Sequence, residues 1–442
     1  MSGGIARGLL GGGLLALAAI AAVAFTTTAA VAGGKLAGGV AQAEAIFAEA
    51  ENLLRVGRVE QARASYERVI KEYTAAEYPQ LVWRAAARVR LGDIQWRSSE
   101  RALAGAEYVG VLEQEPPSFW TGRARLGLAT VVLAGGDWVS AADMMQRVVT
   151  AAELGAADAN VPAAEEARRR LTLIARFRLR PPLDQPLWTS TRALAISGLE
   201  FDRPVSLAAA ADGQLLVVDE GLPSVLLIDA SHANHSRLRY NDHTRPWWGP
   251  DGLPYLPTRR AGVIALGGGH LGFLAGDRGK PAPVKDLQAG ARTLDGHWYL
   301  LDSSPRRILH FGPQGEYANR VTRELEQPVD LTVDASGRLY LLDRSSRAVV
   351  RFRADGTREG RVVSSAWRRP ESVEVDWLGN IYVLDRDART IEVFNEQGRR
   401  IARLGPSLPG GVALRGPRDI AVDGQGRLYV ADRSASAVYV VQ

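Results

Sequence analysis

An arginine directly follows an aspartate at three recurring positions in the C-terminal half of the chain. The pairs are Asp343-Arg344, Asp385-Arg386 and Asp432-Arg433, which lie 42 and 47 residues apart. A guanidinium presents a planar fork of donors that matches a carboxylate, so arginines at one repeated position could receive an acidic group. The alternative is that each aspartate pairs with its arginine and braces a turn or two neighbouring repeats. The sequence leaves both interpretations open.

Three carboxylates near the start of the same repeats suggest a second kind of chemistry. They are Asp330, Glu371 and Asp419. Carboxylate oxygens hold divalent cations in enzymes, but no asparagine accompanies these three at matching positions. The chain also has no Gly-x-Ser-x-Gly nucleophile signature, and its glycine run at 267–269 lacks the Lys-Ser/Thr of a phosphate-binding loop. We predict no catalytic residue, metal or cofactor, and assign the carboxylates and the three arginines to one partner-docking face.

A long stretch between two repeats gathers histidines and tryptophans. Its members are His232, His235, Asp242, His243, Trp247, Trp248 and Asp251. They could form a metal or sugar site, but His-x2-His is short for the usual metal spacing and the stretch is loop-like. We therefore predict an insertion that is solvated or locally packed, with the tryptophan pair capping the repeat domain rather than stacking on a sugar.

Short strands in a repeat must position these side chains. Four stretches share an initial proline, a glycine turn and a second apolar run that ends in aspartate: 204–219, 328–343, 370–385 and 417–432. Asp302 ends a fifth stretch, and its distance from Asp219 leaves room for a divergent sixth, for which 271–277 is the candidate. Four-stranded units of about 40–45 residues predict a six-bladed β-propeller. The repeats resemble the NHL repeat over residues 195–442, which implies the same fold.

The last repeat supplies only three strands before residue 442. The segment 192–196 precedes the first repeat and is strand-like in composition. We predict that this segment pairs with the last repeat, closes the ring and covers both sheet edges.

Residues 43–180 show helical periodicity instead. Small and large residues recur at the same offsets in Ala62, Tyr66 and Val69 and in Ala141, Met145 and Val148, with a poorer copy at Ala102, Ala106 and Val109. These pairs of helices resemble the tetratricopeptide repeat, which implies a helical solenoid with a concave groove. We expect Leu128 and Trp138 in its core, a capping helix at 163–178 and a solvated arginine run at 168–170. A proline-rich linker at 181–190 would separate this domain from the propeller at 191–442.

The first 32 residues predict export. A single charge at Arg7 precedes a long apolar run and the small-x-small sequence that ends at Ala32. This is typical of a cleaved signal peptide, with a second candidate site at Ala43, and the alternative is an uncleaved membrane anchor. Either way, the remainder would lie in the periplasm or cell envelope. The absence of cysteine in 442 residues excludes disulfides and thiolate metal sites.

The balance of charge argues against nucleic acid as a partner. Lys+Arg is 54 and Asp+Glu is 49, and neither half of the chain is strongly basic. The sequence therefore predicts an α + β multidomain protein that binds a protein or peptide through the helical groove and a propeller face, without enzymatic activity. Membrane contact is expected only if the leader stays uncleaved. The alternative is a metal-dependent hydrolase or lyase of the gluconolactonase and regucalcin type, which the propeller resemblance implies as a possibility.

Overall fold

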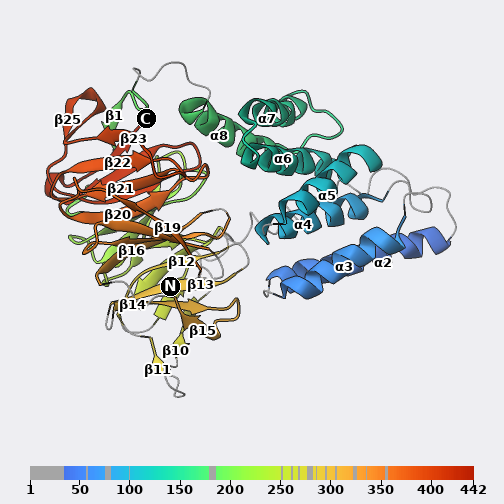
Figure 1. Cartoon of the computed structure of the whole chain (residues 1–442), viewed down its shortest axis with the longest axis horizontal. Coiled ribbons are helices and arrows are strands. Elements are labelled where there is room, and N and C mark those ends of the chain that lie inside the picture. Colours follow the sequence, from blue (N-terminus) through green and yellow to red (C-terminus); the bar gives the residue numbers. More distant parts are fainter. Residues whose placement is uncertain are drawn as a thin grey trace.

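The computed structural model consists of a helical region followed by a β-propeller (Figure 1). It describes residues 34–55, 58–74, 81–98, 100–178, 186–249, 252–259, 262–266, 269–275, 282–284, 286–293, 296–303, 306–321, 326–334, 336–353 and 357–442. The predicted leader at 1–32 and the first half of the predicted linker, residues 181–185, lie outside these residues. None of the helices in the described ranges has the length and apolar character needed to cross a membrane.

Seven helices form the helical region in the described part of the chain. They are α2 (Gly34–Arg55), α3 (Val59–Glu72), α4 (Val82–Arg97), α5 (Arg101–Gln114), α6 (Phe119–Ala134), α7 (Trp138–Glu153) and α8 (Val161–Phe177). Consecutive helices pack on one another, and the predicted seams of the first and third pairs are buried. Leu128 and Trp138 are only partly buried, at the edges of the core clusters.

The second helix pair has a different seam from the predicted one. Ala102 and Ala106 are exposed, whereas Ala104, Tyr108 and Val111 are buried. These three have the offsets of the other two copies, so the repeat is more regular than the predicted alignment suggested. Gly92 and Gly127 flank the ring of Tyr108, and a Cβ at either would lie within 2.8 Å of it.

The propeller consists of six four-stranded antiparallel sheets, or blades. Blade one contains β2 (Pro204–Ala209), β3 (Leu215–Asp219), β4 (Ser224–Ile228) and β5 (His235–Arg239), and blade two β6 (Trp247–Trp248), β7 (Pro254–Thr258), β8 (Gly262–Ala265) and β9 (Gly269–Leu271). Blade three contains β12 (Leu287–Arg292), β13 (Trp298–Ser303), β14 (Arg306–Phe311) and β15 (Tyr317–Arg320), and blade four β16 (Pro328–Val333), β17 (Leu339–Asp343), β18 (Ala348–Phe352) and β19 (Arg358–Val363). Blade five contains β20 (Pro370–Val375), β21 (Ile381–Asp385), β22 (Thr390–Phe394) and β23 (Arg400–Leu404), and blade six β26 (Pro417–Val422), β27 (Leu428–Asp432), β28 (Ala437–Val441) and β1 (Thr191–Ala193).

The predicted closure of the ring is confirmed. Strand β1 pairs with β28, with Thr191 opposite Val441 and Ala193 opposite Tyr439. The N–H of Leu194 extends the pairing by donating to the carbonyl of Val438 at 2.7 Å. One sheet therefore contains strands from both ends of the propeller, with β1 as its outermost strand, and this closes the ring.

The prediction for the divergent blade is wrong. Its second strand is β7, and residues 271–275 instead contribute to its outermost strand β9 and to a hairpin of β10 (Leu274–Ala275) with β11 (Ala282–Pro283). Trp247 and Trp248 do not cap the ring but form the innermost strand β6, where Trp247 stacks on Tyr255. The predicted insertion is thus the outer strand of blade one and the start of blade two.

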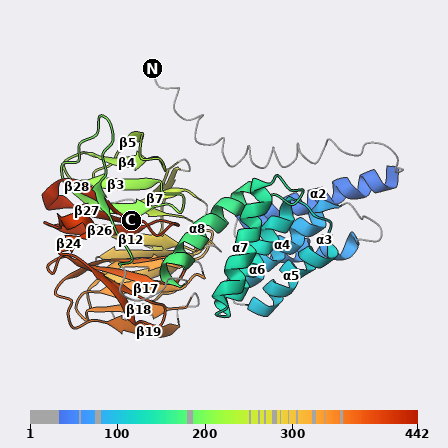
Figure 2. The same ribbon diagram turned by 90° about the horizontal axis from the view of Figure 1, so that it is seen from above.

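Helix α8 joins the two regions (Figure 2). Its residues Leu173 and Ile174 belong to the same apolar cluster as Leu378 of blade five. Arg176 donates to the carbonyl of Gly426 in blade six, to which the indole N–H of Trp188 also donates at 3.3 Å. The helical region is therefore docked on the turns that connect the first and second strands of these blades.

This docking changes the role of the arginine run at 168–170. Arg170 pairs with Glu166, and its guanidinium lies 4.6 Å from the centre of the Trp377 ring in blade five. Its side chain is only 15% exposed. The predicted solvated face is therefore wrong for Arg170, because α8 lies against the propeller instead of ending in solvent.

Candidate functional site

The aspartates that end the second strands fix one end of the propeller. Each accepts backbone N–H groups from the loop that enters its own blade: Asp219 from Asp202 and Arg203, Asp343 from Glu326 and Gln327, Asp385 from Arg368 and Arg369, and Asp432 from Arg415 and Gly416. All four are at most 1% exposed. We call this end of the ring, where the innermost strands begin, the entry end. The aspartates brace it through the backbone, not through the arginines beside them.

The arginines of the Asp-Arg pairs are consequently available for other contacts at the entry end. Arg344 donates to Glu371 of the next blade at 2.8 Å, and Arg433 donates to Glu220 of blade one at 2.8 Å. Arg386 forms no ion pair with any residue that the structure describes. The three predicted arginines and Glu371 therefore lie together, and two of the three link neighbouring blades.

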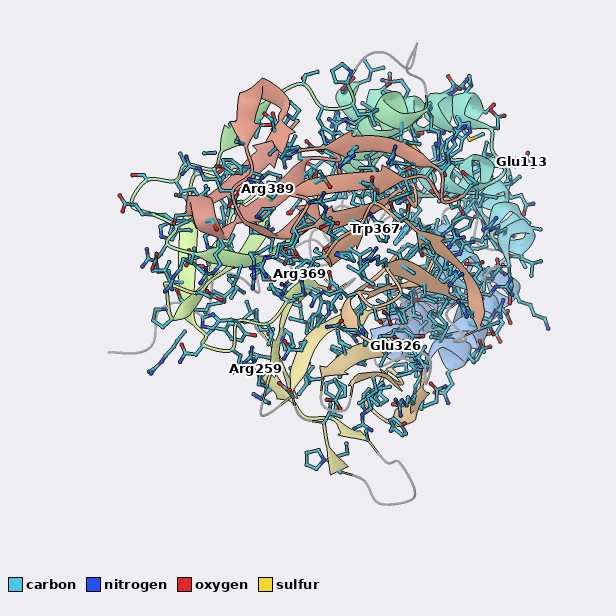
Figure 3. The ribbon with its side chains drawn as sticks, turned by 60° about the vertical axis from the view of Figure 1, so that its left-hand side comes forward. Glu113, Arg259, Glu326, Trp367, Arg369 and Arg389 are labelled. Atoms are coloured by element: carbon cyan, nitrogen blue, oxygen red, sulfur yellow. The ribbon has the colours of Figure 1, made fainter. Side chains whose placement is uncertain are left out.

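Two further arginines belong to this group. Arg369 lies 3.5 Å from Glu371, and Figure 3 shows it near the middle of the ring. Arg418 lies among Arg386, Glu371, Glu220 and Arg433, whose charges act on it. Both flank the initial proline of an innermost strand, and an alignment of those flanking positions would have found them. We call Arg344, Arg369, Arg386, Arg418 and Arg433 the arginine cluster.

Burial and neighbouring positive charges lower the pKa of two arginines of the cluster. Burial lowers the pKa of Arg344, and the charges of Arg369 and Arg386 lower it further, although Glu371 opposes them. Burial likewise lowers the pKa of Arg418, with Arg386 adding to the effect. Positive charge is thus crowded here beyond what the two carboxylates neutralise.

The other two predicted residues, Asp330 and Asp419, lie inside the central channel. They are 6% and 2% exposed and face the guanidinium of Arg245, which enters from blade two. Nη1 of Arg245 donates to Asp419 and lies 3.5 Å from Asp330, while Nη2 donates to the carbonyl of Glu371 at 2.8 Å. The structure therefore separates the predicted docking face into a surface cluster and a buried ion triad of Arg245, Asp330 and Asp419.

The carboxylates of the triad also connect neighbouring blades. Asp330 accepts the N–H of Val373 in blade five at 2.9 Å. Asp419 accepts the hydroxyl of Ser206 at 2.6 Å and the N–H of Leu207 at 2.9 Å, both in blade one. The backbone N–H of Arg245 also donates to the carbonyl of Gln288 in blade three at 2.9 Å. The triad residues thus belong to, or hydrogen-bond with, all six blades.

A cavity of about 120 Å³ adjoins the triad. Its lining includes Trp247, Thr332 and Glu374. Burial raises the pKa of Asp330 to about 7 in spite of Arg245, and burial with the charges of Asp330 and Asp419 raises the pKa of Glu374 well above its ordinary value. Burial alone would lower the pKa of Arg245, but the surrounding carboxylates raise it, so this side chain stays a cation.

This arrangement bears directly on metal chemistry. A divalent cation held by Asp330 and Asp419 would need the space between them, and the guanidinium of Arg245 fills it. Sequence reasoning missed Arg245 because the divergent blade was misplaced. When β6 and β7 are aligned with the first two strands of the other blades, Arg245 falls at the position that Asp330 occupies in blade four and Asp419 in blade six.

The three histidines of the predicted insertion do not converge on a site. His232 is buried, with its ring contacting the carbonyl of Gly213 and Tyr429, and burial lowers its pKa. His235 begins β5, and His243 lies in the connection to blade two. Within the described ranges, no group of three or more histidine or carboxylate side chains is arranged to hold a metal ion.

No protein-family model and no curated protein matches this chain. Solved structures similar to it include streptogramin B lyase, at 10% identity and a TM-score of 0.42, covering 57% of this chain and 97% of that chain. A gluconolactonase from Xanthomonas campestris is 16% identical with a TM-score of 0.44, covering 57% and 88%. A protein of unknown function from Bacteroides thetaiotaomicron is 15% identical with a TM-score of 0.45, covering 57% and 75%. At these identities the similarity concerns the fold and not the activity.

Proposed function

We propose that this protein is a non-enzymatic binding scaffold of the bacterial cell envelope. The observation that carries the proposal is the ion triad, because a guanidinium that is hydrogen-bonded within the channel lies between the two channel carboxylates. Arg245 occupies the place of a cation between Asp330 and Asp419. A metal-dependent hydrolase or lyase would require those carboxylates to be free.

The connection between the two regions supports a scaffold. Helix α8 packs on blades five and six through apolar contacts and hydrogen bonds, so the helical region and the propeller form a single support. Helix pairs of the tetratricopeptide type present a groove for a peptide or helix, and the entry end of the NHL-like propeller is a second surface. The entry end lies at the opposite ends of the innermost strands from the turns that α8 covers, so a partner there would not compete with α8.

The export that this proposal assumes rests on the first 32 residues. N-terminal sequencing of the protein isolated from the envelope tests it. A new N-terminus after Ala32 or Ala43 supports cleavage, whereas an intact Met1 on envelope protein supports an anchor.

Thermal unfolding with and without divalent cations tests the absence of a metal-dependent activity. We expect millimolar Ca²⁺, Mn²⁺ or Zn²⁺ to leave the melting temperature unchanged. A functional site at 100 times its Kd would instead stabilise the fold by about 2.7 kcal/mol, which is several degrees. Stoichiometric metal in the purified protein, with lactone hydrolysis that a chelator abolishes, would overturn the proposal.

A further inference from the structure

The arginine cluster has more positive charge than its surroundings neutralise. Glu371 accepts Arg344 and lies near Arg369, and Glu220 accepts Arg433. Arg386 and Arg418 form no ion pair with a described residue. Five guanidinium groups thus share two carboxylates, on a surface that the aspartate-braced loops hold in place.

The charge is also uneven around the entry end. The described loops of blades four to six carry four more exposed arginines, namely Arg347, Arg368, Arg389 and Arg415, against the two additional carboxylates Glu326 and Asp387. The described loops of blades one to three carry Arg203 and Arg259 against Glu200, Asp202, Asp242 and Asp286. Among the described residues, the excess of arginine therefore lies over blades four to six.

We propose that the arginine cluster binds an acidic segment of a protein partner, which lies across the entry end over blades four to six. This rests on the proposed scaffold function and specifies the chemistry of the partner. Arg386 and Arg418 provide the principal contacts, because their guanidinium groups have no carboxylate of their own. The described loops of the other three blades lack this excess of arginine, so charge complementarity places the acidic segment over blades four to six.

A polypeptide fits this surface better than a phosphate group. Glu371 and Glu220 stand between the arginines, so a dianion placed among them would meet like charge at close range. Separate carboxylates along an extended chain can instead reach Arg386 and Arg418 one at a time. The ion triad adjoins the cluster, because Arg245 donates to Asp419 and to the carbonyl of Glu371.

Binding of a fluorescein-labelled oligoglutamate peptide to the full chain tests this assignment. About eight residues span roughly 26 Å when extended, which is enough to cross the entry strands of neighbouring blades. We expect the double substitution R386Q/R418Q to weaken binding by about tenfold or more at low salt and to flatten its salt dependence. The matched control is R361Q/R403Q, which removes two exposed arginines from the outer strands of blades four and five and is expected to change binding less than twofold.

Three outcomes would overturn the proposal. The control could weaken binding as much as R386Q/R418Q does, which would indicate only attraction to net charge. The peptide could fail to bind at low salt, or inorganic phosphate or anionic phospholipid vesicles could bind through Arg386 and Arg418 while the peptide does not. None of these results would reveal metal or lactone hydrolysis, so they would leave the scaffold function standing and remove only this partner.

Discussion

Blades four to six and blade two form the same sheet from different residues. In the three regular blades, a buried aspartate at the end of the second strand ties the entering loop, and a proline begins the innermost strand. Blade two has Thr258 at the aspartate position and only two residues in its innermost strand. Yet blade two supplies Arg245, the cation on which the channel depends. The residues that recur in the repeats therefore hold the ring together, whereas Arg245, in the blade that departs from the repeat, determines which chemistry the channel allows.

Replacing Arg245 by methionine should have the largest effect. The change leaves Asp330 and Asp419 buried without their cation, and breaking a buried pair in this way costs about 3–5 kcal/mol. Chemical denaturation measures the loss. The control R361M, on the exposed outer edge of blade four, should stay within about 0.5 kcal/mol. Equal stabilities of R245M and the wild type would show that blade two does not hold the channel.

Removing the buried aspartate from a regular blade should have the second-largest effect on stability. D385A leaves the N–H groups of Arg368, Arg369 and Ala388 without their acceptor, which we expect to cost about 3 kcal/mol. T258A, at the equivalent position of blade two, removes one hydroxyl and should cost about 1 kcal/mol. If the two variants lose the same free energy of unfolding, the aspartates are not what distinguishes the regular blades.

The pH dependence of the free energy of unfolding should reveal the buried carboxyl group of Asp330 in the channel. Because folding raises the pKa of Asp330 to about 7, the native state holds this proton more tightly than the unfolded chain does. The contribution of Asp330 to stability is therefore most favourable below about pH 4 and is lost as the pH rises towards 7. We expect D330N to reduce this fall by up to about 4 kcal/mol at pH 7, measured by denaturant unfolding at several pH values. An unchanged pH profile would contradict the inferred burial of the carboxyl charge.

The smallest expected effect is a difference in stability between two glycine variants, one in the turn of blade five and one in the turn of blade six that contacts α8. Gly379 and Gly426 occupy equivalent turns with φ of +77° and +74°. A Cβ at Gly379 would meet Glu396 at 3.5 Å, whereas a Cβ at Gly426 would lie 2.6 Å from Leu173 of α8. Both alanine variants carry the cost of the backbone conformation, and G426A should lose about 1 kcal/mol more. It should also increase proteolysis between α8 and β1, which G379A should not.

The sequence was sufficient for the repeats and for the closure of the ring, but not for the interior of the channel. Proline, turn glycine and terminal aspartate identify blades four to six because each is a local requirement of the strand–turn–strand unit. Blade two lacks the aspartate, so its strands were misplaced and Arg245 was not recognised. The contact between Arg245 and Asp419 joins residues 174 positions apart and exists only once the ring is closed. The docking of α8 was missed for a similar reason. The sequence of an arginine run is the same whether its side chains face solvent or lie against an aromatic ring such as Trp377.

The pairing of β1 with β28 joins two strands that are synthesised at very different times. Strand β1 leaves the ribosome about 250 residues before its partner, which at 5–20 residues per second is a delay on the order of 10–50 s. During that interval β1 has no neighbour, and Asp419 has not yet met Arg245. The ring therefore cannot close before the last strand has been synthesised. The sheet of blade six, the pair of Arg245 with Asp419 and the contact of Trp188 with Gly426 each join residues from both ends of the propeller, so none of them can form before the chain of blade six has been made.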